Sequence, residues 1–84
     1  MKERKLHLTV SSPEKELFDG EISVITLPGS AGSFNVLPNH APIVSSLKKG
    51  AIVYVLPDGS EHKVDIQGGF VEMSNGLLSV CVSL

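Results

Sequence analysis

The sequence of 84 residues holds a single cysteine, and this scarcity excludes an internal disulfide. Sparse cysteine is typical of proteins from a reducing compartment, so we expect a cytoplasmic protein. Cys81 itself lies in the strand-like run 78–82, where no neighbouring group would stabilise a thiolate. We therefore predict that Cys81 is a small core residue and not a reactive thiol.

Long apolar runs and an excess of basic charge are also missing. The longest apolar runs, such as 51–56, are far shorter than the ~20 residues of a membrane-spanning helix. Seven Lys and Arg face nine Asp and Glu, whereas nucleic-acid binding requires a basic surplus. After Lys5 the chain alternates polar and apolar residues, unlike a signal peptide. We expect no nucleic-acid partner, no membrane span and no export.

The residues that are present indicate one globular all-β domain over residues 1–84. Apolar residues make up 42% of the chain and charged residues 19%, which is typical of a soluble folded domain. Apolar positions recur at a spacing of two, and Gly, Pro, Asn and Asp interrupt them about every ten residues. Short, numerous strands bury their apolar faces best in two packed sheets, so the pattern predicts a β-sandwich or flattened barrel.

Individual strands can be predicted from the alternation, and their turns from short polar dipeptides. Asp58-Gly59 and Asn75-Gly76 favour two-residue hairpin turns, and Asp19-Gly20 is a third turn candidate. Residues 13–18 have the composition of at most a single helical turn. The strands expected between these signals are residues 6–10, 21–27, 33–37, 42–47, 51–56, 61–67, 70–73 and 77–82.

Two of the predicted strands are apolar on both faces, which a lone sandwich does not require. In residues 51–56, and in much of 22–27, one face should fill the core. The other face must be covered by a crossing strand or by a partner protein. Gly68-Gly69 interrupt another run, where glycines mark a bulge or a close backbone approach, or alternatively a pivot for a partner's backbone.

Motifs for catalysis, metal binding or cofactor binding are weak. The Gly-rich stretch 28–33 lacks the Gly-Lys-Ser/Thr ending of a phosphate-binding loop, so we interpret it as structural. His40 lies between Pro38 and Pro42, but His7 and His62 are distant in sequence and match no zinc spacing. We expect no catalytic residue, no metal and no cofactor, and we predict that His40 orients its loop through a backbone hydrogen bond.

Three stretches of the chain carry a family likeness. Residues 13–20, 27–42 and 68–73 resemble, in order and in spacing, the N-terminal domain of ATP synthase epsilon subunits. The most specific parts are the proline-bracketed element Leu37-Pro38-Asn39-His40-Ala41-Pro42 and the element Gly68-Gly69-Phe70-Val71-Glu72. The likeness covers nearly the whole chain. The start at Met1, with no Arg-rich presequence, favours a bacterial source over a mitochondrial one.

This resemblance implies a flattened β-sandwich of about ten short strands. It also implies a non-catalytic central-stalk (rotor) subunit of F-type ATP synthase, which clasps the gamma subunit and rests on the ring of c subunits, coupling ion translocation to ATP synthesis. The protein would lie at the cytoplasmic face of the bacterial inner membrane, attached only through the complex. Loops at one end of the sandwich would contact the c-ring through Ser30, Ser33, Asn35, Asn39, His40 and Pro42.

Ser33 stands where several members of the family carry an acidic residue, which puts a charge-dependent ring contact there in doubt. Family members commonly continue into an inhibitory two-helix hairpin, whereas this chain stops at Leu84. If the sequence is complete, we expect helical inhibition and ATP sensing to be absent.

Two other function classes can be weighed against the rotor. A lipoyl- or biotin-type carrier domain would display a lysine at a hairpin tip, and Lys48-Lys49-Gly50 could form that tip, although the flanking residues do not match a carrier lysine. A small enzyme would rest on His40 beside the Gly-rich loop, but so thin a sandwich leaves no room for a deep pocket.

Overall fold

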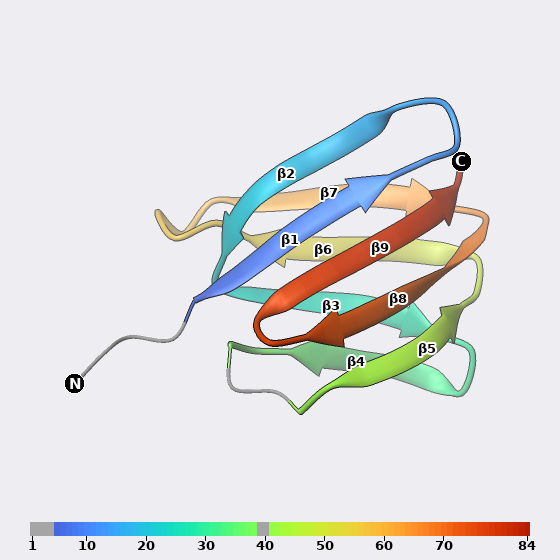
Figure 1. Cartoon of the computed structure of the whole chain (residues 1–84). Helices are drawn as coiled ribbons and strands as arrows, with labels where there is room; N and C mark the ends of the chain where they lie inside the picture. Colours follow the sequence, from blue (N-terminus) through green and yellow to red (C-terminus); the bar gives the residue numbers. More distant parts are fainter. Residues whose placement is uncertain (1–4, 39–40) are drawn as a thin grey trace.

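The computed structural model describes residues 5–38 and 41–84, and the secondary structure of these residues consists of strands and turns without a helix. This confirms the all-β prediction. Figure 1 shows the nine strands of this part of the chain. They are β1 (Leu6–Ser11), β2 (Glu16–Ile22), β3 (Val24–Gly29), β4 (Gly32–Val36), β5 (Ile43–Leu47), β6 (Gly50–Val55), β7 (Glu61–Ile66), β8 (Gly68–Ser74) and β9 (Leu77–Ser83).

The strands form one continuous sheet that curls into two packed layers. Their order is β2-β1-β9-β8-β5-β3-β6-β7, and β4 pairs with β3 off this path. The first layer holds β2, β1, β9, β8 and β5, and the second holds β7, β6, β3 and β4 behind it (Figure 1). A single residue pair, Gly29 with Leu47, joins β3 to β5 at the corner. The flattened sandwich expected from the sequence is therefore confirmed.

The core lies between the two layers and follows the predicted alternation. Leu6, Leu8 and Val10 of β1 point inward and are fully buried, as their spacing of two requires. Burying one such side chain contributes about 1.5–3 kcal/mol, which makes the buried core as a whole the main source of stability. The remaining core residues are Ile22, Ile25, Leu27, Val36, Leu47, Ile52, Tyr54, Ile66, Val71, Met73, Leu78, Val80 and Val82.

The two predicted hairpin turns both connect the expected strands. Asn75 and Gly76 have φ values of 54° and 75°, which are the positive values that a two-residue turn between β8 and β9 needs. The turn at Asp58-Gly59 joins β6 to β7 as predicted, but its loop is longer than two residues. There the Leu56 amide donates to the Ser60 carbonyl at 2.9 Å, so the loop closes outside the dipeptide.

The region from residue 13 to residue 27 differs from the prediction. Residues 13–18 form no helical turn, because β2 already begins at Glu16 and pairs with β1. Asp19-Gly20 lie inside β2, opposite Thr9 and Leu8, and are not a turn. The predicted strand 21–27 breaks at Ser23, where the chain passes from the first layer to the second. The apolar pattern of residues 21–27 continues through Ser23, so the sequence alone did not reveal this crossing.

Gly69 confirms the prediction of a close backbone approach. A Cβ at this position would lie 2.2 Å from the carbonyl oxygen of Cys81, so no side chain fits. The neighbouring backbone belongs to β9 of the same chain, where Gly69 pairs with Val82. The close packing at Gly69 is thus an internal feature of the first layer.

Candidate functional site

A polar border runs along β4 and the hairpin that precedes it. Of the six residues predicted to contact a c-ring, Ser30, Ser33 and Asn35 lie here, and all three are exposed. The Ser46 hydroxyl donates to the Ser30 hydroxyl at 2.8 Å, and the Ser30 amide donates to the Ser46 carbonyl at 3.0 Å. These bonds fix the hairpin tip to β5. We call Ser30, Ser33 and Asn35 the β4 border.

The remaining predicted contact residues lie elsewhere. Pro42 is exposed and precedes β5, whose first residue Ile43 pairs with Met73 of β8. Pro42 is four residues before Ser46, so about 13 Å of extended chain separates it from the Ser30 contact. The structure therefore places the two loops at opposite ends of β4, along the lower border in Figure 1, and does not bring Ser30 and Pro42 together. Asn39 and His40 lie outside the described residues.

Three exposed apolar side chains, which we call the apolar island, lie on the outer face of the first layer, where the exposed pair of Glu72 and Ser79 separates Leu77 from Phe70. Val44, Phe70 and Leu77 are 77%, 51% and 60% exposed, and they come from β5, β8 and β9. Phe70 lies opposite Cys81, which in turn lies opposite Ser11 of β1. Cys81 therefore faces outward and is half-buried, so the prediction of a core cysteine is wrong. Its inward neighbours Val80 and Val82 fill the core instead.

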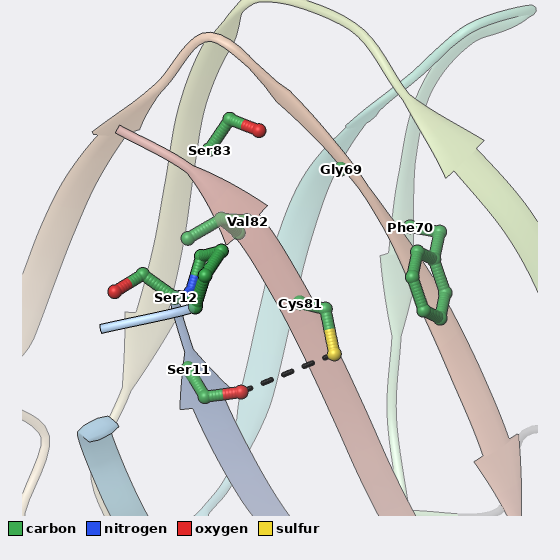
Figure 2. Close-up of a pocket in the computed structure, with 8 residues that line it drawn as sticks. Ser11, Ser12, Gly69, Phe70, Cys81, Val82 and Ser83 are labelled. Carbon is green, nitrogen blue, oxygen red and sulfur yellow. Dashed lines mark hydrogen bonds between the residues drawn. The ribbon is translucent and has the colours of Figure 1, made fainter. Parts of the chain in front are cut away.

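Beside Phe70 the island contains an open pocket, which Figure 2 shows from outside. Its cavity volume is about 290 Å³, and none of its lining residues carries a charge. The Ser11 hydroxyl lies 3.9 Å from the Cys81 sulfur, a weak contact between the neighbouring strands β1 and β9. Such a site can accept an apolar side chain and offers hydroxyls at its rim. The lining residues are Ser11, Ser12, Pro13, Gly69, Phe70, Cys81, Val82 and Ser83.

Sequence reasoning missed this island because it treated 70–73 and 77–82 only as sources of core residues. The signal was nevertheless present in the alternation. Once Val71 and Val80 are assigned to the core, Phe70 and Cys81 must point to the opposite face. A phenylalanine on the outer face of a strand is the observation that would have indicated this exposed apolar surface.

The second layer presents a different outer surface. Ala51, Val53 and Val55 of β6 are half-buried there, beside Val24 of β3. Charged residues of β7 flank this valine stripe, and Lys63 lies opposite Val53. None of the nine strands crosses over the stripe, so the crossing-strand alternative for residues 51–56 is not realised in the described chain. Cover by a partner stays a prediction.

The titratable groups that are close together stabilise turns and edges. The amide and the hydroxyl of Ser60 donate to the Asp58 carboxylate and lower its pKa. Tyr54 stacks on His62 with ring centroids 5.5 Å apart, and burial raises the pKa of Tyr54. His7 contacts Asp19 between β1 and β2. Residues 5–38 and 41–84 contain no cluster of three potential metal ligands.

The lysines of the carrier hypothesis do not lie at a hairpin tip. Lys48 and Lys49 connect β5 to β6, which pair with different neighbours and not with each other in the described sheet. The Lys48 amide donates to the Pro28 carbonyl at 2.9 Å, which ties this connection to β3. The geometry expected of a carrier lysine is therefore absent from this connection.

In the same described residues, no helix could cross a membrane.

Comparisons with known proteins give a consistent result. Residues 5–83 match the family described as ATP synthase, Delta/Epsilon chain, beta-sandwich domain. An ATP synthase epsilon chain of Maricaulis maris is 45% identical over 76 residues, which are 90% of this chain and 56% of that protein. One from Caulobacter vibrioides is 46% identical over 70 residues, which are 82% of this chain and 79% of that protein. The chain thus spans little more than half the length of several such relatives.

Solved structures agree on the fold. A chain in the Euglena gracilis mitochondrial ATP synthase structure, covering OSCP, F1 and c-ring, superposes with a TM-score of 0.90 at 21% identity over 98% of this chain and 52% of its own. A chain in the Tetrahymena thermophila mitochondrial central stalk and c-ring structure gives 0.78 at 22% identity, over 100% of this chain and 67% of its own. The family match over residues 5–83 and the 46% identity to the Caulobacter vibrioides epsilon chain show that the chain belongs to the family of ATP synthase delta/epsilon β-sandwich domains.

Proposed function

We propose that this domain acts in a non-catalytic central-stalk subunit of a bacterial F-type ATP synthase, where it links a gamma subunit to the c-ring. The observation that carries the proposal is the 45% identity to a bacterial epsilon chain over 90% of this chain. A torque-transmitting part needs a stiff body with two separate interfaces. The sandwich offers two candidate surfaces, which adjoin at Ser46: the apolar island on the outer face of the first layer, and the β4 border along the second layer.

The apolar island is the surface that we assign to gamma. Its three large side chains are at least half exposed, which a soluble domain tolerates best when a partner covers them. An aromatic anchor beside an uncharged pocket is the arrangement that carries binding energy in protein interfaces. The valine stripe is the alternative, but its side chains are already half-buried and charged β7 residues lie along one side of them.

The β4 border, with the loop that contains Asn39, His40 and Pro42, is the surface that we assign to the polar loops of the c-ring. Ser30, Ser33 and Asn35 offer neutral hydrogen-bonding groups there. Ser33 carries no charge, so contact at this point would depend little on salt. In this arrangement the domain is a peripheral component at the cytoplasmic face of the inner membrane, held there by the complex.

Co-expression with a gamma subunit from the same organism tests the proposal. We expect a one-to-one complex by size-exclusion chromatography and native mass spectrometry. Phe70→Lys should abolish the complex, whereas Val53→Lys, the matched change on the valine stripe, should preserve it.

The opposite pattern would move the gamma contact to the stripe. If the unchanged chain and gamma both fold but form no complex, the rotor proposal is wrong for this chain. Circular dichroism of each variant provides the folding control.

A further inference from the structure

Two carboxylates of β2 on the outer face of the first layer have basic neighbours, whereas a carboxylate of β8 on the same face has none. Asp19 contacts His7 across the β1–β2 pair. A carboxylate oxygen of Glu21 lies 3.9 Å from the Lys5 ammonium nitrogen. Glu72 of β8 is exposed, and its side chain forms no ion pair or hydrogen bond in the described part of the chain. It is an isolated charge on the face that we assign to gamma.

The neighbours of Glu72 across and along the sheet carry no charge. Val44 of β5, which is 77% exposed, lies opposite it on one side, and Ser79 of β9 lies opposite it on the other. Phe70 precedes it by two residues in the same strand, so both side chains point outward. Glu72 therefore lies among the side chains of the apolar island. A partner that covers the island also removes this carboxylate from water.

An open hollow adjoins Glu72 at the start of β5. Its cavity volume is about 290 Å³, and Glu72 is the one charged residue among the described residues that line it. Most of the other lining residues are apolar. A lysine or arginine suits such a hollow, because its aliphatic stem packs on apolar surface while its charged head meets the carboxylate. The lining residues are Pro42, Ile43, Val44, Glu72, Met73 and Ser74.

The carboxylate of Glu72 needs compensation once the island is covered. Moving an ionised group out of water is unfavourable unless an opposite charge and hydrogen-bond donors replace the lost water. The described lining of the hollow contains no basic residue, so this chain supplies no cation there. The cation must therefore come from the partner.

We propose that gamma inserts a lysine or arginine side chain into the hollow and that Glu72 pairs with it, which makes Glu72 a residue that determines the choice of partner. Val44 and Ile43 pack on the aliphatic stem of the inserted side chain. Phe70 supplies apolar contact area beside the ion pair, while the charge fixes which surface of gamma can dock. The inference rests on the assignment of the apolar island to gamma, and it adds the chemistry that gamma presents there.

Neutralising Glu72 tests the proposal, because the sign of the effect depends on the pairing. Titration with gamma at low salt should give Glu72→Gln an affinity at least about tenfold below that of the unchanged chain. Salt screens an ion pair, so this difference should shrink as the salt concentration rises. Glu72→Lys sets like charges against each other and should abolish the complex at low salt. Circular dichroism of each variant provides the folding control.

Asp65→Asn is the matched control. It removes the same charge from an exposed position of β7, opposite Ala51 in the second layer. This variant should bind gamma as tightly as the unchanged chain at every salt concentration. An equal loss in Asp65→Asn and Glu72→Gln would trace the effect to net charge and would overturn the pairing.

Equal or tighter binding of Glu72→Gln also overturns the proposal, because removal of an unpaired carboxylate makes the island easier to cover. If the unchanged chain and gamma both fold but form no complex, the proposed function is wrong and this inference falls with it. Pro42 ends the loop that we assign to the c-ring, so the ring is the other possible source of the cation. Glu72→Gln that binds gamma normally, but weakens binding of the gamma complex to isolated c-rings, would overturn the pairing with gamma.

Discussion

The centre of the first layer and the β4 border differ in how their strands are held. In the centre, β1, β9 and β8 are each paired on both sides, their inward side chains are buried, and Gly69 contacts the β9 backbone directly. At the border, β4 pairs with β3 alone among the described strands, and the Thr26 hydroxyl donates to the side-chain oxygen of exposed Asn35 at 2.8 Å. We infer that stability resides mainly in the centre and that the border is free to serve recognition.

The sharpest way to break this comparison is to remove a buried side chain from the centre. Leu8→Ala should lower the free energy of unfolding by about 2–5 kcal/mol, because it removes core contacts and leaves a cavity. A domain of this size has only about 4–12 kcal/mol in total. Denaturant titration measures the loss, and Leu77→Ala, an exposed leucine of the same layer, should change stability little. Equal losses in the two variants would contradict the layered core.

The backbone contact at Gly69 should produce the next largest effect. Gly69→Ala forces a methyl group against the Cys81 carbonyl and should cost about 1–3 kcal/mol. The neighbouring Gly68→Ala is the control, because a Cβ there has its nearest contact at an ordinary 3.6 Å. Thermal unfolding of the two variants should separate them clearly. Similar midpoints would mean that β8 and β9 can move apart at no cost.

At the border, the loss of a side-chain bond should matter less. Ser46→Ala removes the hydroxyl that donates to Ser30, and we expect a loss of about 0.5–1 kcal/mol at most. Ser79→Ala, an exposed serine of the centre, is the matched control. A loss comparable to that of Leu8→Ala would show that the border, and not only the core, holds the fold together.

The smallest effect is expected in the β6–β7 loop, outside both regions. Hydrogen bonds from Ser60 lower the pKa of Asp58 in the folded state, so the ionised form is stabilised there. This contribution is present above the unfolded pKa of about 4 and is lost as the pH falls through the lowered folded value. Asp58→Asn should therefore lower the melting temperature slightly at about pH 6, and the difference should vanish at strongly acidic pH. A difference that grew on acidification would contradict the assignment.

Sequence reasoning predicted the fold where alternation and turn chemistry agreed. Leu6, Leu8 and Val10 share one buried face, and Asn75-Gly76 form the expected turn, because a period of two and positive φ are local properties. The prediction failed between residues 13 and 27. Asp19-Gly20 are compatible with a turn, yet pairing with β1 continues through them, and only tertiary contacts decide between these outcomes.

The candidate site was harder to predict than the fold. The family likeness indicated Ser30, Ser33 and Asn35, and the structure places all three on one border. The likeness did not indicate that Ser30 and Pro42 lie apart, because a strand must be placed in a sheet before its two ends can be located. The apolar island was missed for a similar reason: Val44, Phe70 and Leu77 come from three strands, and their common place on one outer face follows only from the strand order and register.

The parallel pair of β1 and β9 has a consequence for how the chain acquires its fold. β1 begins at Leu6, but its neighbour β9 begins at Leu77, so the first of the described strands pairs with the ninth. β9 also separates β1 from β8, and without it the β1–β2 hairpin has no attachment to the first layer. Contacts so distant in sequence slow folding and leave apolar strands uncovered in the meantime. During translation the first layer can therefore close only after residue 83 has left the ribosome, and until then the inward side chains of β1 lack their neighbours from β9.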